Sequence, residues 1–548
     1  MLDLLVRGGL VLDGRGGPGQ QADVGVVDGR IAMVGDGRGQ SAAVSVDAEG
    51  LVVAPGFIDM HAHSDLQLLA EPSHEAKVRQ GVTLEVLGQD GLSYAPVTDE
   101  TLPQLQDQLA AWNGNPPGFD WSWRSVGEYL DRLDEGIAVN AAYLIPHGSV
   151  RMAVMGVEDR PPSTAELDEM LALVGQGMAE GAFGLSTGLT YAPGMYADDD
   201  ELVALLKPVA AFGGYYCTHH RNYGSRAFAA YAEAIDIARR AGVGLQLSHC
   251  LLPFPVNRGR APELAAMIDG ARAEGVDVTF DAYPYTAGST YLHAFLPGWM
   301  SAGGTAETVE RLRRTDLRPR LRVEVEEVGS DGFNGVPVDW NVVVISGTRH
   351  ERNGRWVGLS VAEAATTAGQ SPFDFACDLV ADEELGTACV MHVGNEDNNR
   401  FLMTHAAAMV GSDGILVGQR PHPRAWGCFP RVLGTYVREL GVLSLEAAVA
   451  QMTSRAAARL GLHDRGVVAA GAVADLVCFD PETVADRATY ESPRQAPAGI
   501  PHVFVNGRAV VADGRLVGDL PGRSVRPGGA PLPPVVYQPV GRDREGWR

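Results

Sequence analysis

The chain has 548 residues, 45% hydrophobic and 20% charged, and no uninterrupted apolar run approaches the ~18 residues that a membrane span requires. Acidic residues outnumber basic ones by 68 to 44, and the resulting formal charge of -24 argues against nucleic-acid partners, because phosphate backbones would be repelled. This length predicts a large barrel or several domains rather than one small core.

The N-terminus carries an acidic residue, Asp3, where a secretory signal peptide has its positive charges, and no long apolar stretch follows it. We therefore predict a cytoplasmic protein without a membrane partner. The six cysteines are scattered without a C-x-x-C pair, which predicts reduced, buried thiols rather than a disulfide framework.

Short alternating strands occur near both ends of the chain. In the first fifty residues, Asp28-Gly29 separates two such runs and predicts a hairpin, because both turn residues tolerate positive φ. The same pattern returns in residues 474–480 and 503–508. We predict one small β-sandwich formed from two distant halves, residues 1–53 and 463–521.

Between these halves, residues 54–462 alternate short apolar strands with helical stretches such as 164–179 and 225–241. This alternation is typical of repeated βα units, and its length suits an α/β fold with a (β/α)₈ TIM-type barrel. Trp-, Pro- and Gly-rich segments near 102–133 and 291–338 break the rhythm, so we predict insertions there that shape a lid or a specificity element. Residues 522–548 form a C-terminal extension rich in Pro, Gly and Arg, predicted to be extended or partly disordered.

The first motif with clear chemistry follows the apolar run Gly56-Phe57-Ile58-Asp59. His61 and His63 stand two residues apart after it. Side chains at positions i and i+2 of a strand point to the same side, so the two imidazoles can chelate one ion at the strand's carboxyl end. We predict a metal site there.

Five further motifs follow in order and span most of the chain. Together with the His61-x-His63 strand, they resemble those of the N-acyl-D-amino-acid deacylases of the amidohydrolase superfamily. The motifs are Gly184-Leu-Ser-Thr-Gly-Leu-Thr-Tyr-Ala-Pro-Gly194, Thr218-His-His-Arg-Asn222, Ser248-His249, Gly411-Ser-Asp-Gly414 and His422-Pro-Arg-Ala-Trp-Gly427.

The resemblance implies that His219 and His249 are metal ligands after strands five and six. The neighbouring His220 should point to the opposite side of its strand and receives no metal role. Asp413, after strand eight, matches the aspartate that contacts both metal and water. Such a carboxylate can take a proton from water and return it to the leaving nitrogen, while a bound metal lowers the pKa of that water from about 15.7 toward about 7.

The chain departs from the family pattern at two positions. Asp90 stands where a ligating cysteine is expected; a carboxylate can replace the thiolate as a ligand or bridge, although it is less selective for zinc, and an Asp-Gly turn residue is the alternative. After Ser248-His249 the family commonly continues with His-Lys, whereas this chain has Cys250-Leu251. Loss of that lysine would alter substrate recognition.

A substrate α-carboxylate is best recognised by a planar guanidinium, for which Arg424 and Arg221 are the candidates. A structural salt bridge is the competing interpretation of both. Tyr283 and Ser289, in the segment after strand seven, offer hydroxyls for substrate contacts, with a packed aromatic lid as the alternative. The resemblance adds Tyr191 to the predicted substrate-binding residues.

The sequence as a whole predicts hydrolysis of the amide bond of N-acyl-D-amino acids, or of a related small amide, by metal-bound hydroxide with Asp413 as general base and acid. The metal set is predicted to be His61, His63, Asp90, His219, His249 and Asp413, holding one or two zinc ions, with manganese or cobalt as alternatives. A cyclic amide hydrolase, a D-selective dipeptidase and a catalytically silent barrel scaffold remain open, as does a homo-oligomer.

Overall fold

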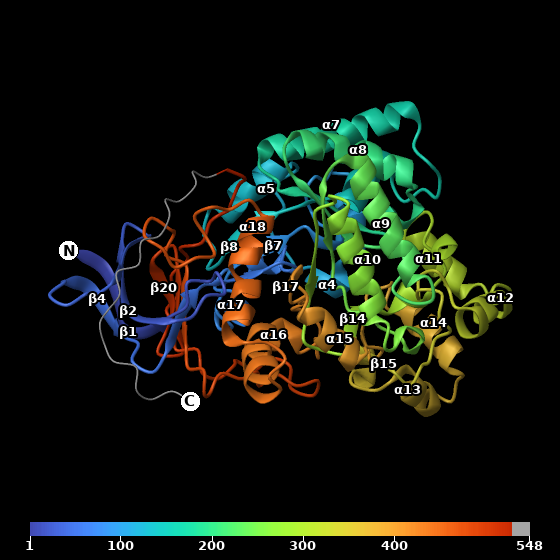
Figure 1. Ribbon diagram of the computed structural model, residues 1–548. Helices are drawn as coiled ribbons and strands as arrows, with labels where there is room; N and C mark the ends of the chain where they lie inside the picture. Colours follow the sequence, from blue (N-terminus) through green and yellow to red (C-terminus); the bar gives the residue numbers. More distant parts are fainter. Residues whose placement is uncertain (529–548) are drawn as a thin grey trace.

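A computed structural model describes residues 1–528 of the chain. Figure 1 shows three parts along the molecule: a β-sheet that carries the N-terminus, a central barrel wrapped by helices, and a further layer that contains α11 to α14 on the far side. None of the helices within residues 1–528 is long and apolar enough to span a bilayer. The six cysteines, all within this range, are buried and form no disulfide, as predicted.

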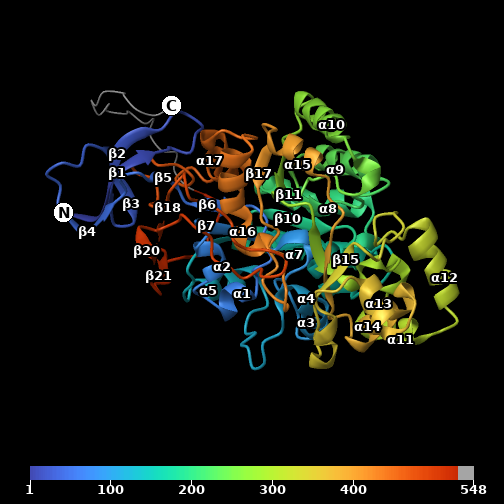
Figure 2. The same ribbon diagram turned by 90° about the horizontal axis from the view of Figure 1, so that it is seen from below.

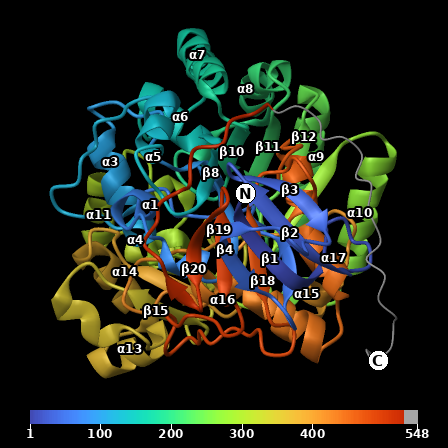
Figure 3. The same cartoon turned by 90° about the vertical axis from the view of Figure 1, so that its left-hand side faces the viewer.

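Strands from both ends of the chain share one nine-stranded sheet. Its path is β21-β20-β19-β18-β5-β1-β2-β3, and β4 pairs with β1. In Figure 3 the blue N-terminal and red C-terminal strands lie side by side. The strands are β1 (Leu2–Val11), β2 (Gln20–Val27), β3 (Arg30–Gly35), β4 (Ala42–Asp47), β5 (Val52–Pro55), β18 (Leu476–Phe479), β19 (His502–Val505), β20 (Arg508–Ala512) and β21 (Arg515–Leu516).

Two local features explain how this sheet is connected. The predicted turn between β2 and β3 has positive φ at both Asp28 (50°) and Gly29 (73°), as an Asp-Gly hairpin requires. β5 joins the two ends of the chain, since it pairs in parallel with β1 and antiparallel with β18. The first and last strands of the chain therefore depend on each other for their hydrogen bonds.

The central part is an eight-position parallel barrel, which agrees with the predicted α/β TIM-type fold. Its pairings run β6-β7-β8 and β9-β10-β11-β12-β13-β17, with β8 and β9 consecutive at one position. The barrel closes between its first and last strands, where Met60 N donates to Val410 O (3.2 Å). The strands are β6 (Phe57–Asp59), β7 (Val82–Leu87), β8 (Asn140–Tyr143), β9 (Ile145–Pro146), β10 (Gly184–Gly188), β11 (Tyr215–His219), β12 (Gly244–Leu247), β13 (Val278–Ala282) and β17 (Ala408–Val410).

Helices cover the outside of the barrel (Figure 1). The predicted helical stretches at 164–179 and 225–241 are found as α7 and α9, and α7 begins with a capping box between Ser163 and Glu166. The helices outside the segment between β13 and β17 are α1 (Gln67–Ala70), α2 (Glu75–Val78), α3 (Leu102–Gln108), α4 (Ala110–Asn113), α5 (Val126–Leu133), α6 (His147–Met155), α7 (Thr164–Glu180), α8 (Asp199–Ala211), α9 (Ala227–Ala241), α10 (Ala261–Ala273), α16 (Arg424–Arg431), α17 (Leu445–Met452) and α18 (Ser454–Arg459).

The segment between β13 and β17 forms a layer of its own, visible in Figure 2 around β15 and α11 to α14. It extends well beyond the predicted insertion at 291–338, and its antiparallel sheet has the order β14-β16-β15. A separate cluster of buried hydrophobic side chains, including Phe295, Trp340 and Phe373, forms its core. Its elements are β14 (Gly288–Tyr291), α11 (Thr305–Arg313), α12 (Arg318–Arg322), β15 (Val343–Gly347), α13 (Val361–Ala368), α14 (Pro372–Asp382), β16 (Ala388–Met391) and α15 (Glu396–Met403).

Short 3₁₀ and π turns complete the structure. They are η1 (Gln89–Gly91), η2 (Gly194–Tyr196), η3 (Pro255–Asn257), η4 (Leu292–Phe295), η5 (Gly298–Met300), η6 (Val323–Val328), η7 (Glu351–Trp356) and η8 (Val432–Glu439). Of the predicted C-terminal extension, residues 529–548 lie outside the described part. The preceding residues run beside the barrel, where Val525 N donates to Ala141 O (2.7 Å).

Candidate metal centre

Six histidine and aspartate side chains meet at one end of the barrel. Each lies in or just after a barrel strand at its carboxyl end, where parallel strands bring their following loops together. His61 and His63 follow β6, Asp90 follows β7 within η1, His219 ends β11, His249 follows β12, and Asp413 follows β17. All six are buried.

These side chains form two donor groups that share one residue. The first contains His61, His63, Asp90 and Asp413, the second contains Asp90, His219 and His249, and the ligand atoms of each group lie within 4.8 Å of one another. Asp90 Oδ1 lies 3.4 Å from His61 Nε2, and Asp90 Oδ2 lies 3.3 Å from His219 Nδ1. The two carboxylate oxygens of Asp90 thus face different groups.

The donor atoms have the properties of an ion-binding site. Both ring nitrogens of His61 and Oδ1 of Asp90 are buried without a hydrogen-bond partner within the described chain. Buried polar atoms are normally hydrogen-bonded, so unpartnered lone pairs that converge on one point fit a cation. Two atoms bound to one zinc ion at ~2.1 Å stand roughly 3.4 Å apart, close to the separations found here.

Unusual backbone torsion angles set the direction of several of these side chains. Asp90 (φ 54°), His249 (φ 32°) and Asp413 (φ 49°) occupy the left-handed region, which non-glycine residues rarely adopt. Tertiary hydrogen bonds hold two of them, because His249 N donates to Oδ1 of Asp281 (2.8 Å) and Asp413 N donates to His61 O (2.8 Å). Strained backbone held in this way is a frequent property of functional sites.

An ionic network lies beneath the donor groups. Lys77 Nζ, fully buried, contacts carboxylate oxygens of Asp59 (2.7 Å) and Glu85 (2.8 Å), and it donates to Ser412 Oγ (2.9 Å). Burial alone would raise the pKa of Glu85, but the Lys77 ammonium and the His74 imidazole lower it to about 2. The network fixes the turn that carries Asp413, because Ser412 precedes it.

Charges around the two site aspartates favour their ionised forms. Burial alone would raise both pKa values, yet the imidazoles of His61 and His219 hold the pKa of Asp90 well below its ordinary value. The Arg424 guanidinium lowers the pKa of Asp413 in the same way, with Nη1 2.9 Å from Oδ2. Both carboxylates are therefore available as anionic ligands.

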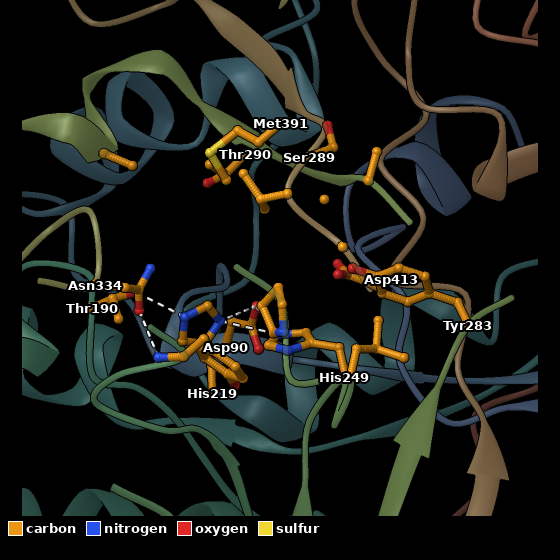
Figure 4. A pocket seen from close by; sticks show the side chains of 18 of the residues that line it. Asp90, Thr190, His219, His249, Tyr283, Ser289, Thr290, Asn334, Met391 and Asp413 are labelled. Atoms are coloured by element: carbon orange, nitrogen blue, oxygen red, sulfur yellow. Dashed lines mark hydrogen bonds and ion pairs between the residues drawn. The ribbon is translucent and has the colours of Figure 1, made fainter. Parts of the chain in front are cut away.

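A cavity of about 870 Å³, counted up to its open mouth, lies against the donor groups. Figure 4 shows Asp90, His219 and His249 together on one wall, with Ser289, Thr290 and Met391 across the open space. The predicted substrate-binding residues Tyr191, Tyr283 and Ser289 all line it.

The two predicted arginines occupy different places. Arg424 is fully buried with its guanidinium 4.5 Å from the ring centre of Tyr283, and Nη2 donates to Ser289 O (3.3 Å). Neither arginine is among the described residues that line the cavity. Arg221 Nε pairs with Glu233 (2.8 Å) and its terminal nitrogens donate to two backbone carbonyls, which agrees with the competing interpretation of Arg221 as a structural salt bridge.

Sequence reasoning assigned no role to several other residues of the site. Thr190 Oγ1 lies 2.8 Å from His219 Nε2, on the far side of the ring from Asp90. Trp112 packs on His63 with ring centres 4.8 Å apart, and Tyr223 packs on His219 at 4.7 Å. Asp281, whose Oδ1 accepts a hydrogen bond from His249 N, could have been found because it lies near the carboxyl end of β13, where the barrel strands present their functional residues.

Residues 45–511 match the family described as the amidohydrolase family. The chain is 39% identical to an N-acyl-D-glutamate deacylase of Alcaligenes xylosoxydans xylosoxydans, over 93% of either chain. It is 37% identical to a D-aminoacylase of the same organism, over 95% of this chain and 97% of that one.

A solved structure gives the same comparison in three dimensions. The N-acyl-D-glutamate deacylase of Bordetella bronchiseptica, complexed with zinc and a phosphonate inhibitor that mimics the tetrahedral intermediate, superposes with a TM-score of 0.82 at 34% identity. The superposition covers 96% of this chain and all of the other.

Proposed function

The chain belongs to the amidohydrolase family, and from this premise we propose that it hydrolyses the amide bond of N-acyl-D-amino acids with a divalent metal ion. One observation carries the proposal: the buried, unpartnered donor atoms of His61 and Asp90 converge beside a cavity large enough for a small substrate. The deacylase names of the relatives and the phosphonate-bound neighbour support the choice of reaction.

The residues proposed to hold metal are His61, His63, Asp90, His219, His249 and Asp413. The mixed nitrogen and oxygen donors suit zinc, with manganese or cobalt as alternatives. Since Asp90 belongs to both donor groups, the set would hold one or two ions. A divalent ion bound there would polarise the scissile carbonyl and make water a better acid.

Asp413 is the proposed proton carrier. Its carboxylate takes a proton from the attacking water as the water oxygen bonds to the carbonyl carbon. The same carboxyl group then gives the proton to the amide nitrogen as the carbon–nitrogen bond breaks, which yields a carboxylic acid and an amine. The acid then loses its proton and the amine gains one, so the products at neutral pH are a carboxylate and an ammonium group. The Ser412 backbone and hydroxyl, held by Asp59 and Lys77, keep Asp413 in place for both transfers.

Arg424 is the proposed partner of the substrate α-carboxylate. Its Nε is buried without a hydrogen-bond partner in the described chain, so a donor remains for a ligand. A guanidinium pairs with a carboxylate through two parallel hydrogen bonds. Tyr283 and Ser289, beside Arg424, and Tyr191, beside His219, are proposed to complete the contacts with substrate.

We also propose that the nine-stranded sheet folds into the predicted small β-sandwich. Buried side chains of both halves, such as Val24 and Ile31 from one and Leu476 and Phe504 from the other, belong to one hydrophobic cluster. The sandwich would support β6, which follows β5 after a single residue and leads to His61.

The test is hydrolysis of matched N-acetyl-D- and N-acetyl-L-amino acids by metal-stripped protein and by protein reloaded with zinc, manganese or cobalt. We expect turnover of the D-enantiomers only, and only after metal is restored. Bound metal is measured separately by elemental analysis. Metal-loaded protein that cleaves neither enantiomer would overturn the proposed reaction.

A further inference from the structure

The walls of the cavity differ in chemistry. One wall carries the donor groups, and Met391 lies across the open space from them in Figure 4. The lining also includes a set of apolar side chains, here called the apolar part: Leu251, Phe254, Ala294, Phe333, Met391 and Val393. These apolar side chains come from the loop after β12, from η4, from the loop near residue 333 and from β16 and its end. Four separate segments thus contribute apolar side chains to the same cavity.

This apolar part has no positive charge of its own. No lysine or arginine is found among the described residues that line the cavity. Arg424, the nearest guanidinium to the site, faces Asp413, Tyr283 and the carbonyl of Ser289. Asn334, a polar side chain near the apolar part, already accepts a hydrogen bond from Tyr223 N (2.8 Å) through Oδ1.

We propose that the preferred N-acyl-D-amino acid has an uncharged, apolar side chain, and that N-acyl-D-glutamate and N-acyl-D-aspartate are poor substrates. This inference rests on the proposed function and specifies its substrate class. Of the relatives compared above, one is named for glutamate and the other name specifies no side chain, so we argue the preference from the residues that line the cavity.

The physical reason is the cost of an unpaired buried charge. An acidic substrate brings two carboxylates, and Arg424, whose guanidinium contacts the lining residues Asp413, Tyr283 and Ser289, is the proposed partner of the one on the α-carbon. The second would enter the apolar part and lose its hydration without a cation to replace the water. A methionine, leucine or phenylalanine side chain instead gains free energy by leaving water there.

The decisive measurement is kcat/KM of the zinc-loaded protein for N-acetyl-D-methionine, -D-leucine, -D-glutamine and -D-glutamate. We expect the first two to exceed glutamate by about 100-fold or more, the usual scale for an uncompensated buried charge. Glutamine has nearly the shape of glutamate without its charge, so it should exceed glutamate by about 10-fold.

The outcomes separate the two proposals. Equal or faster cleavage of N-acetyl-D-glutamate would overturn the apolar preference and leave the deacylase function standing. No cleavage of any of the four substrates by metal-loaded protein would overturn the deacylase function itself.

A charge-introducing variant tests the location of this selectivity. Met391 is partly buried on β16 and faces the cavity in Figure 4. Met391→Lys keeps a long unbranched side chain and adds an ammonium, so the ratio of glutamate to glutamine kcat/KM should rise about 10-fold or more. Met391→Leu changes the shape without charge and should leave that ratio near its original value. An unchanged ratio in folded, metal-containing Met391→Lys would place the side chain of the substrate elsewhere.

Discussion

The two walls of the cavity are built in different ways. The donor groups sit on the ends of barrel strands, held by parallel hydrogen bonding and by the buried ions around Lys77. The opposite wall comes largely from the layer between β13 and β17, which has its own sheet and hydrophobic core. The barrel therefore fixes the atoms for chemistry, whereas a separately packed layer supplies the surface that meets the variable part of a substrate.

The strongest expected effect concerns the barrel wall. Asp413→Asn removes the proposed base while nearly keeping the shape of the side chain, and kcat for N-acetyl-D-methionine should fall by about 10³-fold or more. Asp168→Asn, on the exposed surface of α7, is the matched control and should retain full activity. Activity of Asp413→Asn within tenfold of the parent would remove Asp413 from the mechanism.

The next largest effect is expected on the free energy of unfolding, when the buried ion pairs of Lys77 are broken. Lys77→Met leaves two buried carboxylates without their cation and should lower the free energy of unfolding by about 3–5 kcal/mol. Lys207→Met changes the chain's other lysine, an exposed residue of α8 whose ammonium donates to Arg240 O (2.6 Å), and should cost no more than about 1 kcal/mol. Urea titration measures both, and equal losses would show that the buried network does not support the barrel wall.

A smaller effect, on metal affinity, is expected from Thr190, which is hydrogen-bonded to a residue of the donor groups. Thr190→Val removes the hydroxyl beside His219 Nε2 but preserves the volume, and metal affinity should weaken by about 10–100-fold. Chelator competition measures this affinity directly. Thr190→Ser keeps the hydroxyl and should remain close to the parent, while equal weakening in both variants would assign the effect to packing.

The smallest expected effect is a loss of stability in the layer between β13 and β17. Ser360→Ala breaks the capping box of α13, in which Ser360 Oγ accepts from Glu363 N (3.2 Å) and Glu363 returns the bond. It should cost about 1 kcal/mol of stability and leave bound metal unchanged. Loss of metal in this variant would show that the two walls are not independent, and Ser360→Thr is its control.

The same contrast explains what could be predicted from the sequence. The barrel and the convergence of six donor residues could be predicted from local patterns. An apolar run followed by a histidine or an aspartate indicates a strand and also marks the carboxyl end of that strand. His61 and His63 are the clearest case, since strand periodicity alone places them on one side.

The parts that could not be predicted depend on contacts between distant segments. Lys77 reads as an ordinary helical lysine until β6 and β7 bring Asp59 and Glu85 beside it. Arg221 lies two residues from His219 in sequence, but its guanidinium is paired with Glu233 on α9. The layer after β13 was underestimated because β15 and β16 pair with each other and with β14 across long helical stretches.

The pairing of β5 with both β1 and β18 has a consequence for synthesis of the protein. One edge of β5 receives its partner only after the whole barrel has left the ribosome. At about 5–20 residues per second, that edge waits on the order of half a minute. An unpaired strand edge can form hydrogen bonds with another chain and so promote aggregation. A chaperone that covers the newly synthesised N-terminal strands should therefore raise the yield of active protein.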